Sequence, residues 1–286
     1  MRSFFLLLAG LLLVSAPASA DSAGELSILQ EFFAPKGMES RSTRLTGAAL
    51  EHFSSRPLVG EYLPAEATTE FRLLIENETT AIYEAVVSRD GVAEMWSAFF
   101  QRGPFSSKLE AIKALNLPPY LAGVEYKKLL AHQGRSATQE SRLAQLQRLF
   151  MSTSAFKEYF NQNRPTYEAI ARLVETGKTE EAQAAVKTAA LLGVRLYGET
   201  KSEGEMALLI PPVAGKGPDK TKQLGSEIRI SGFLDSVLGL LHLPTGVSPP
   251  TMSSQDYIFV ESLDDNWYLF RNLAAEPLKE KSATNE

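Results

Sequence analysis

The chain has 286 residues, a formal net charge of −5 at pH 7 and no cysteine. A mild acidic excess with intermixed signs gives it no electrostatic reason to bind nucleic acid. The absence of cysteine excludes thiol catalysis, disulfides and thiolate metal sites. The length suits one large domain or two small ones.

Residues 1–20 have the pattern of a cleavable secretory signal peptide. Arg2 precedes an apolar run over residues 4–14, which is too short to span a bilayer. Residues 18–20 then match the small-x-small sequence that signal peptidase accepts. The pattern predicts cleavage after Ala20 and a soluble mature protein in the periplasm or secreted, with no membrane span. The lack of cysteine favours a bacterial periplasm over a disulfide-rich eukaryotic setting.

Residues 21–115 predict a helical start followed by a β region. Leu26, Leu29 and Phe33 recur at helical spacing, and Ala34-Pro35 ends that helix. We therefore expect short, broken helices before the first strand.

The β region is predicted to contain two strands joined by a tight turn. Apolar residues alternate over 81–87, with Glu84 on the opposite face. Residues 89–91, Arg-Asp-Gly, predict a hairpin turn because glycine accepts a positive φ without cost. A second strand is predicted over 92–100, whereas residues 105–115 fit a strand or a helix.

Residues 116–193 predict a helical region that includes an antiparallel helix pair. Tyr167 and Ile170 recur at helical spacing after Pro165, which suits the first turn of a helix. Gly177 is typical of a helix end, and a new helix is predicted to open directly after it.

Residues 194–276 predict a second β region. Two glycines within 228–243 argue against one long helix there, and residues 257–262 and 267–271 predict a final hairpin. The charged residues 277–286 predict a disordered tail.

The order helix, β, helix, β predicts an α+β fold, with antiparallel hairpins packed against helices and a central helical region. The sequence leaves open whether the two β regions form one sheet or two domains. The Pro/Gly/Lys-rich loop 211–225 is predicted to be mobile.

Two short stretches resemble known families. Residues 81–112, with the Asp-Gly turn and Trp96, are similar to the sheet hairpins of nuclear-transport-factor-like cone folds. Residues 167–190 resemble one helical pair of a tetratricopeptide array, a repeat that needs three or more copies to bury its faces. These resemblances imply local structure, and neither implies an activity.

Local motifs for catalysis or ligand binding fail on their spacing. Residues 177–179, Gly-Lys-Thr, lack the upstream glycine of a phosphate-binding loop. Residues 154–157 fit Ser-x-x-Lys but lack the distant partner motifs of penicillin-recognising enzymes. His52, His132 and His242 have no second ligand at His-x-x-x-His spacing. We therefore expect no cofactor and no metal.

The leading functional hypothesis is a non-catalytic exported protein that binds a small ligand or a cell-envelope partner, with Trp96, Phe100 and His242 as candidate ligand-groove residues. The alternative is a hydrolase whose site assembles from distant segments, for example His242 with Asp256 or Glu261, because catalytic triads are defined by geometry and not by sequence order.

The burial of the two tryptophans can also be predicted from the sequence. Large aromatics on an alternating strand usually mark its buried face. Trp96 and Trp267 are therefore predicted to be mostly buried against the helical layer. The competing hypothesis for Trp96 is that it lines an open ligand groove.

Overall fold

The computed structural model describes residues 20–64, 66–89, 92–115, 119–197, 225–233 and 236–273. The predicted signal segment up to residue 19, residues 211–224 of the predicted loop and the tail 277–286 lie outside this part of the chain. Within it, no helix combines the length and the apolar character that crossing a membrane requires.

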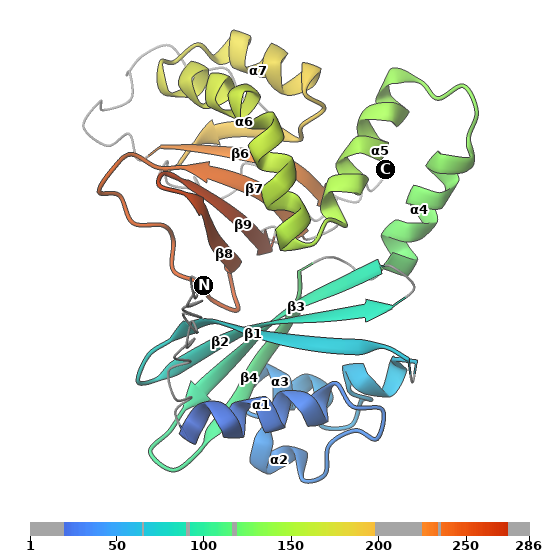
Figure 1. Cartoon of the computed structure of the whole chain (residues 1–286), viewed down its shortest axis with the longest axis vertical. Helices are drawn as coiled ribbons and strands as arrows, with labels where there is room; N and C mark the ends of the chain where they lie inside the picture. Colours follow the sequence, from blue (N-terminus) through green and yellow to red (C-terminus); the bar gives the residue numbers. More distant parts are fainter. Residues whose placement is uncertain are drawn as a thin grey trace, which may run out of the picture.

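Helices and two antiparallel sheets make up the structure (Figure 1), which confirms the predicted α+β class. The first half contains α1 (Ala20–Phe32), α2 (Arg41–Arg44), α3 (Gly47–Phe53), η1 (Val59–Tyr62), β1 (Thr68–Glu76), β2 (Thr80–Arg89), β3 (Val92–Arg102) and β4 (Ser107–Ala114). The second half contains α4 (Pro119–Ala131), α5 (Ala137–Leu149), α6 (Thr153–Glu175), α7 (Thr179–Thr188), β5 (Gly193–Leu196), β6 (Ser226–Phe233), β7 (Ser236–His242), β8 (Tyr257–Asp264) and β9 (Trp267–Leu273).

The first sheet is a meander in the order β1-β2-β3-β4. Strands β2 and β3 pair antiparallel, with Arg89 opposite Val92, as expected for the predicted hairpin; residues 90–91 of its turn lie outside the described part of the chain. Residues 107–114, part of the ambiguous stretch, form strand β4. Helices α1 to α3 cover the face of this sheet that lies away from the second half (Figure 1).

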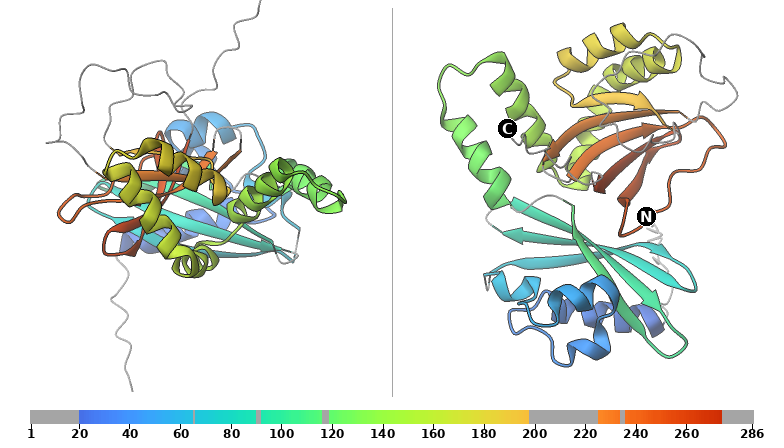
Figure 2. Two further views of the ribbon diagram at one scale, coloured as in Figure 1. Left: turned by 90° about the horizontal axis from the view of Figure 1, so that it is seen from above. Right: turned by 180° about the vertical axis from the view of Figure 1, so that it is seen from behind.

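The second sheet has the order β5-β6-β7-β9-β8 and shares no strand with the first. Helices α6 and α7 lie against it, as the view from behind shows (Figure 2). The two β regions therefore form separate sheets, a point that the sequence left open.

Helix α6 begins earlier than predicted. Pro165 was expected in a first helical turn, but it lies inside α6, which starts at Thr153. Proline removes one backbone hydrogen bond from a helix. The helix continues through it because both of its halves bury apolar side chains in one core: Phe156, Phe160, Tyr167 and Ile170. After Gly177, which takes a φ of +73°, the chain enters α7.

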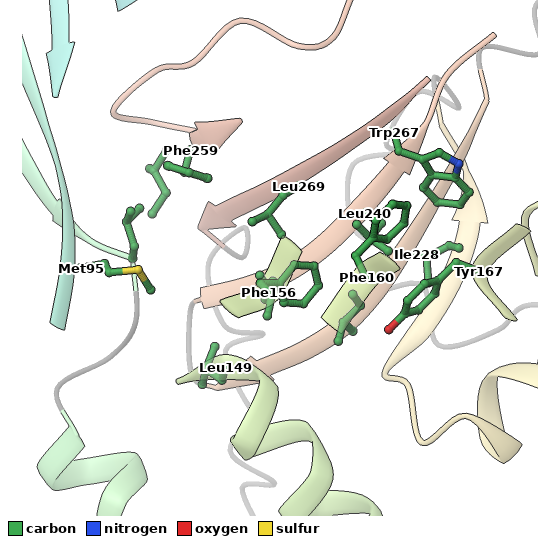
Figure 3. Close-up of a cluster of buried hydrophobic side chains, with 14 of the residues drawn as sticks. Met95, Leu149, Phe156, Phe160, Tyr167, Ile228, Leu240, Phe259, Trp267 and Leu269 are labelled. Carbon is green, nitrogen blue, oxygen red and sulfur yellow. The ribbon is translucent and has the colours of Figure 1, made fainter. Parts of the chain in front are cut away.

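One buried cluster joins the two halves of the chain. Met95 of the first sheet belongs to the same cluster as Phe156 of α6 and Phe259 and Leu269 of the second sheet (Figure 3). Glu84 lies on the face of β2 opposite the predicted apolar stripe, as expected, yet that face is also covered and Glu84 is 3 % exposed. The first sheet is therefore buried on both faces.

Polar contacts reinforce this shared core. Thr153 at the start of α6 donates a hydrogen bond to Oε1 of Glu84 at 2.9 Å, and Arg72 contacts Oε2 of Glu84 at 2.6 Å. Arg271 of β9 is buried and donates to the carbonyl of Leu115 at 2.7 Å, where the chain leaves the first sheet. Burial lowers the pKa of Arg271 to about 10. The contacts of Thr153 and Arg271 fix the second half against the first, and the Arg72 contact holds Glu84 in place within the first sheet.

Candidate functional site

Two cavities of different chemistry lie on the described part of the chain. The larger, of 1130 Å³, is bounded by α3, η1 and the strands β3 and β4. The smaller, of 420 Å³, is bounded by α6, the end of β7 and the turn between β8 and β9. Each contains one of the candidate groove residues: Trp96 lines the larger cavity and His242 the smaller.

The larger cavity depends on the way α3 is held on β4. The N–H of Thr46, the residue before α3, donates to the carbonyl of Leu109 on β4 at 2.9 Å. Gly47 then begins α3 with a φ of +48°, a left-handed conformation that costs other residues free energy. This anchor lays α3 across the edge of the sheet.

A second anchor fixes η1 against α1. Gly60 has no room for a side chain, because a Cβ atom there would lie 2.2 Å from the carbonyl carbon of Phe33. Arg41 donates to the carbonyls of Phe53 at 2.8 Å and Arg56 at 2.5 Å, and to Glu61 at 2.7 Å. Its guanidinium therefore ties the segment after α3 to η1, and sequence reasoning gave Arg41 no role.

The wall of the larger cavity is mainly apolar. Its apolar and aromatic lining residues are Ala48, Ala49, Phe53, Pro57, Val59, Tyr62, Leu63, Trp96, Ala111 and Ile112. Tyr62 is 70 % exposed, whereas Ala49 and Ala111 are buried. The cavity thus opens to solvent at one side and reaches into the protein at the other.

Trp96, a predicted groove residue, lies in this wall. It is partly buried, and its ring lies 6.4 Å from that of Phe33, the residue after α1, in an edge-on arrangement. Its Nε1 atom is buried and has no hydrogen-bond partner among the described residues, so the indole presents carbon and not its N–H to the open cavity. The expectation that both tryptophans are mostly buried holds fully for Trp267, which is 2 % exposed.

Phe100, the second predicted groove residue, is on the same strand face as Trp96 but lines neither cavity. It is fully buried, with its ring 5.7 Å from that of Tyr83. Helix α1 covers this part of the sheet, whereas the sheet beside Trp96 faces the cavity.

Charged side chains surround the apolar wall: Glu51, His52, Arg56 and Glu94. Arg56 contacts Nδ1 of His52 at 3.4 Å. Lys113 of β4 also borders the cavity, but strand alternation places its side chain on the face of Ala111 and Leu115, opposite the face of Trp96. The cavity therefore combines an apolar interior with a charged rim.

The smaller cavity is polar and contains His242, the third predicted groove residue. Nδ1 of His242 lies 2.7 Å from Oε1 of Glu175, and its ring is 4.6 Å from that of Trp267. The opposite side carries Arg164, which pairs with Glu168 at 2.7 Å and with Asp264. His242 thus pairs with Glu175 of α6, not with Asp256 or Glu261.

Serine, acid and histidine meet here without forming a triad. Ser226 is fully buried and donates to the Glu175 carboxylate at 3.5 Å. In a Ser-His-Asp triad the serine contacts the imidazole, and its oxygen is open to substrate. Among the described residues, no three His, Asp or Glu side chains are grouped as metal ligands would be.

Comparison of the chain with protein-family models, curated proteins and solved structures gives no match. The two cavities are therefore the features that bear on function. The candidate residues Trp96 and His242 lie in different cavities.

Proposed function

We propose that the mature protein is an exported, non-catalytic binding protein that takes a small apolar molecule into the larger cavity. The observation that carries this proposal is the apolar wall beside Trp96. The volume of the cavity, 1130 Å³, lies just above the range of about 300–1,000 Å³ typical of ligand sites. Burial of apolar ligand surface contributes roughly 25 cal/mol per Å², so such a wall favours apolar molecules.

The lining of this cavity supports binding over catalysis. It contains no serine, threonine or cysteine that could act as a nucleophile. Its single histidine, His52, is exposed and contacts Arg56. The charged groups lie at the rim, where they can orient a ligand.

Export is part of the proposal because of the pattern in residues 1–20. Helix α1 begins at Ala20, so cleavage after that residue would leave the helix almost complete. Glu25, which binds Arg102 at 2.7 Å inside the protein, would be retained. N-terminal sequencing of the secreted protein should therefore find Asp21 first.

The binding proposal is tested with a neutral fluorescent dye, phenylnaphthylamine, whose emission rises in apolar surroundings. We expect a saturable rise with the wild-type protein. Ala48→Trp places a large side chain at an exposed position of the cavity lining and should weaken the dye affinity at least about tenfold. Ala184→Trp, at an exposed position of α7, is the matched control and should leave it unchanged.

Two outcomes would overturn the proposal. An emission that rises linearly with dye concentration means that no defined site exists. Equal affinities for the wild type and Ala48→Trp place the dye outside the larger cavity.

A hydrolase at the smaller cavity is the second candidate. The His242–Glu175 contact of 2.7 Å favours it, because an acid that holds an imidazole in one orientation is what general-base catalysis requires. With Ser226 buried, the nucleophile would be water. Release of nitrophenol from nitrophenyl esters by the wild type, and its loss in His242→Gln, would support this candidate over the binding protein.

A further inference from the structure

We propose that the larger cavity also accepts Phe105 from a second copy of this chain, so that copies associate head to tail. The part that enters the cavity is the turn between β3 and β4, residues 103–106. This contact goes beyond the proposed function, because it gives the protein a partner. It uses the same cavity as the small ligand, so the two exclude one another.

The turn between β3 and β4 presents an uncovered aromatic side chain to solvent. Phe105 is 97 % exposed, the largest exposed fraction among the large apolar side chains that the structure describes. Pro104 before it is exposed as well. The turn lies at an edge of the molecule (Figure 1), where a second copy can approach it. A phenylalanine ring gains free energy when it leaves water, so insertion into an apolar cavity is favourable.

Hydrogen bonds hold this turn in place. The N–H of Gly103 donates to the carbonyl of Ser106 at 3.1 Å, which closes the turn. At its base, the N–H of Arg102 donates to the carbonyl of Thr79 at 2.8 Å, and the Arg102 side chain binds Glu25 at 2.7 Å. Because the backbone is already fixed, insertion of the aromatic side chain costs little conformational entropy.

The cavity of the same chain is out of reach of Phe105. Trp96 lines the cavity six positions before β3 ends at Arg102, a separation of about 20 Å at roughly 3.3 Å per residue. Phe105 lies beyond that end of the strand. The protruding side chain and the cavity are therefore at opposite ends of the same strand pair, and the contact can form only between two copies.

The chemistry of the wall suits this side chain, but the contact is small. Trp96 presents carbon to the cavity, and Phe53 is a second aromatic residue in the wall. Insertion of one large aromatic buries on the order of 150–250 Å² of its surface. Stable interfaces bury about 1,200–2,000 Å² in total. Self-association is therefore weak, with an expected Kd on the order of 0.1–1 mM.

Sedimentation equilibrium of the mature protein, from about 10 μM to about 1 mM, measures this association. The average mass should rise with concentration and continue past that of a dimer, because a heterologous contact leaves a free turn and a free cavity at the two ends of each assembly. Phe105→Ser should raise the Kd at least about tenfold. Leu192→Ser removes another exposed apolar side chain and is the control, which should associate as the wild type does.

Two variants together test the pairing of turn and cavity. Ala48→Trp fills the cavity and keeps Phe105, whereas Phe105→Ser keeps the cavity open. Each alone should stay monomeric over this range, and a mixture of the two should form a one-to-one complex. A wild-type mass that does not change with concentration, undiminished association of Phe105→Ser, or no complex in the mixture would overturn this inference. Phe105→Ser should bind phenylnaphthylamine as the wild type does, so loss of association alone leaves the proposed function standing.

Discussion

The carboxylate of Glu261 on β8 accepts two hydrogen bonds from Arg72 on β1, at 2.9 and 2.5 Å, although the two residues are 189 positions apart. Lys157 of α6 donates to the same carboxylate at 2.5 Å. Arg72 also binds Glu84 on the neighbouring strand. The sheet that carries the larger cavity is thus tied to the second half by charges at its edge as well as by the shared core.

Removal of the Glu261 charge should loosen this connection. Glu261→Gln leaves Lys157 without its carboxylate and Arg72 with Glu84 alone. We expect the free energy of unfolding to fall by about 2 kcal/mol, the size typical of hydrogen bonds to charged groups. Urea unfolding measures it. The control is Glu181→Gln, which breaks the exposed pair with Lys178 and should cost less than about 1 kcal/mol. Equal effects of the two substitutions would show that the Glu261 contacts do not stabilise the fold.

The stability of the protein should fall in acid because of Glu25. Burial acts to raise the pKa of Glu25, but hydrogen bonds from Arg102, Ser107 and Tyr83 outweigh it and hold the pKa below its ordinary value of 4.5. A carboxyl whose pKa is lower when folded stabilises the protein fully above its unfolded pKa. That contribution is lost as the pH falls through the lower, folded value.

Glu25→Gln should therefore destabilise the protein at neutral pH by about 3 kcal/mol, because Arg102 is 7 % exposed and loses the buried one of its two carboxylate partners, keeping only Glu76. The difference from the wild type should shrink as the pH is lowered below about 4.5. Unfolding in urea at a series of pH values measures this. A constant difference at all pH values would mean that Glu25 is not ionised in the folded protein.

The two tryptophans should respond differently to truncation. Trp267 is buried in the core beside Phe160, with ring centroids 5.4 Å apart, so Trp267→Ala should cost roughly 3–5 kcal/mol. Trp96 has the cavity on one side, and Trp96→Ala should cost distinctly less while it weakens dye binding. Denaturant unfolding measures the stability of both variants, and dye titrations measure their affinity for the dye. A Trp96→Ala cost as large as that of Trp267→Ala would make Trp96 a core residue.

Local patterns in the sequence predicted those parts of the fold whose determinants are close together along the chain. The alternation over 81–87 and the Asp-Gly turn predicted β2 and β3 as a hairpin, and Gly177 marked the end of α6. The start of α6 predicted from Pro165 was wrong, because core contacts on both sides of this proline outweigh the one backbone hydrogen bond that it removes.

The cavity itself had no local signature. It joins residues 48–63 to residues 94–113, and only the packing of α3 on β4 brings them together. Trp96 was identified as a candidate because a large aromatic on an alternating strand is conspicuous. The partner of His242 was missed for the same reason as the cavity, since Glu175 is 67 residues away on another element.

The most direct test of ligand binding in the larger cavity uses Trp96 as a reporter. Bromodecanol is neutral, and its bromine quenches tryptophan emission on contact. In Trp267→Phe, where Trp96 is the remaining tryptophan, we expect strong, saturable quenching, because Trp96 lines the cavity. In Trp96→Phe the emission comes from Trp267, which is 2 % exposed, and should stay unquenched. Quenching of Trp267 to the same extent, or no saturable quenching of Trp96, would contradict binding in this cavity.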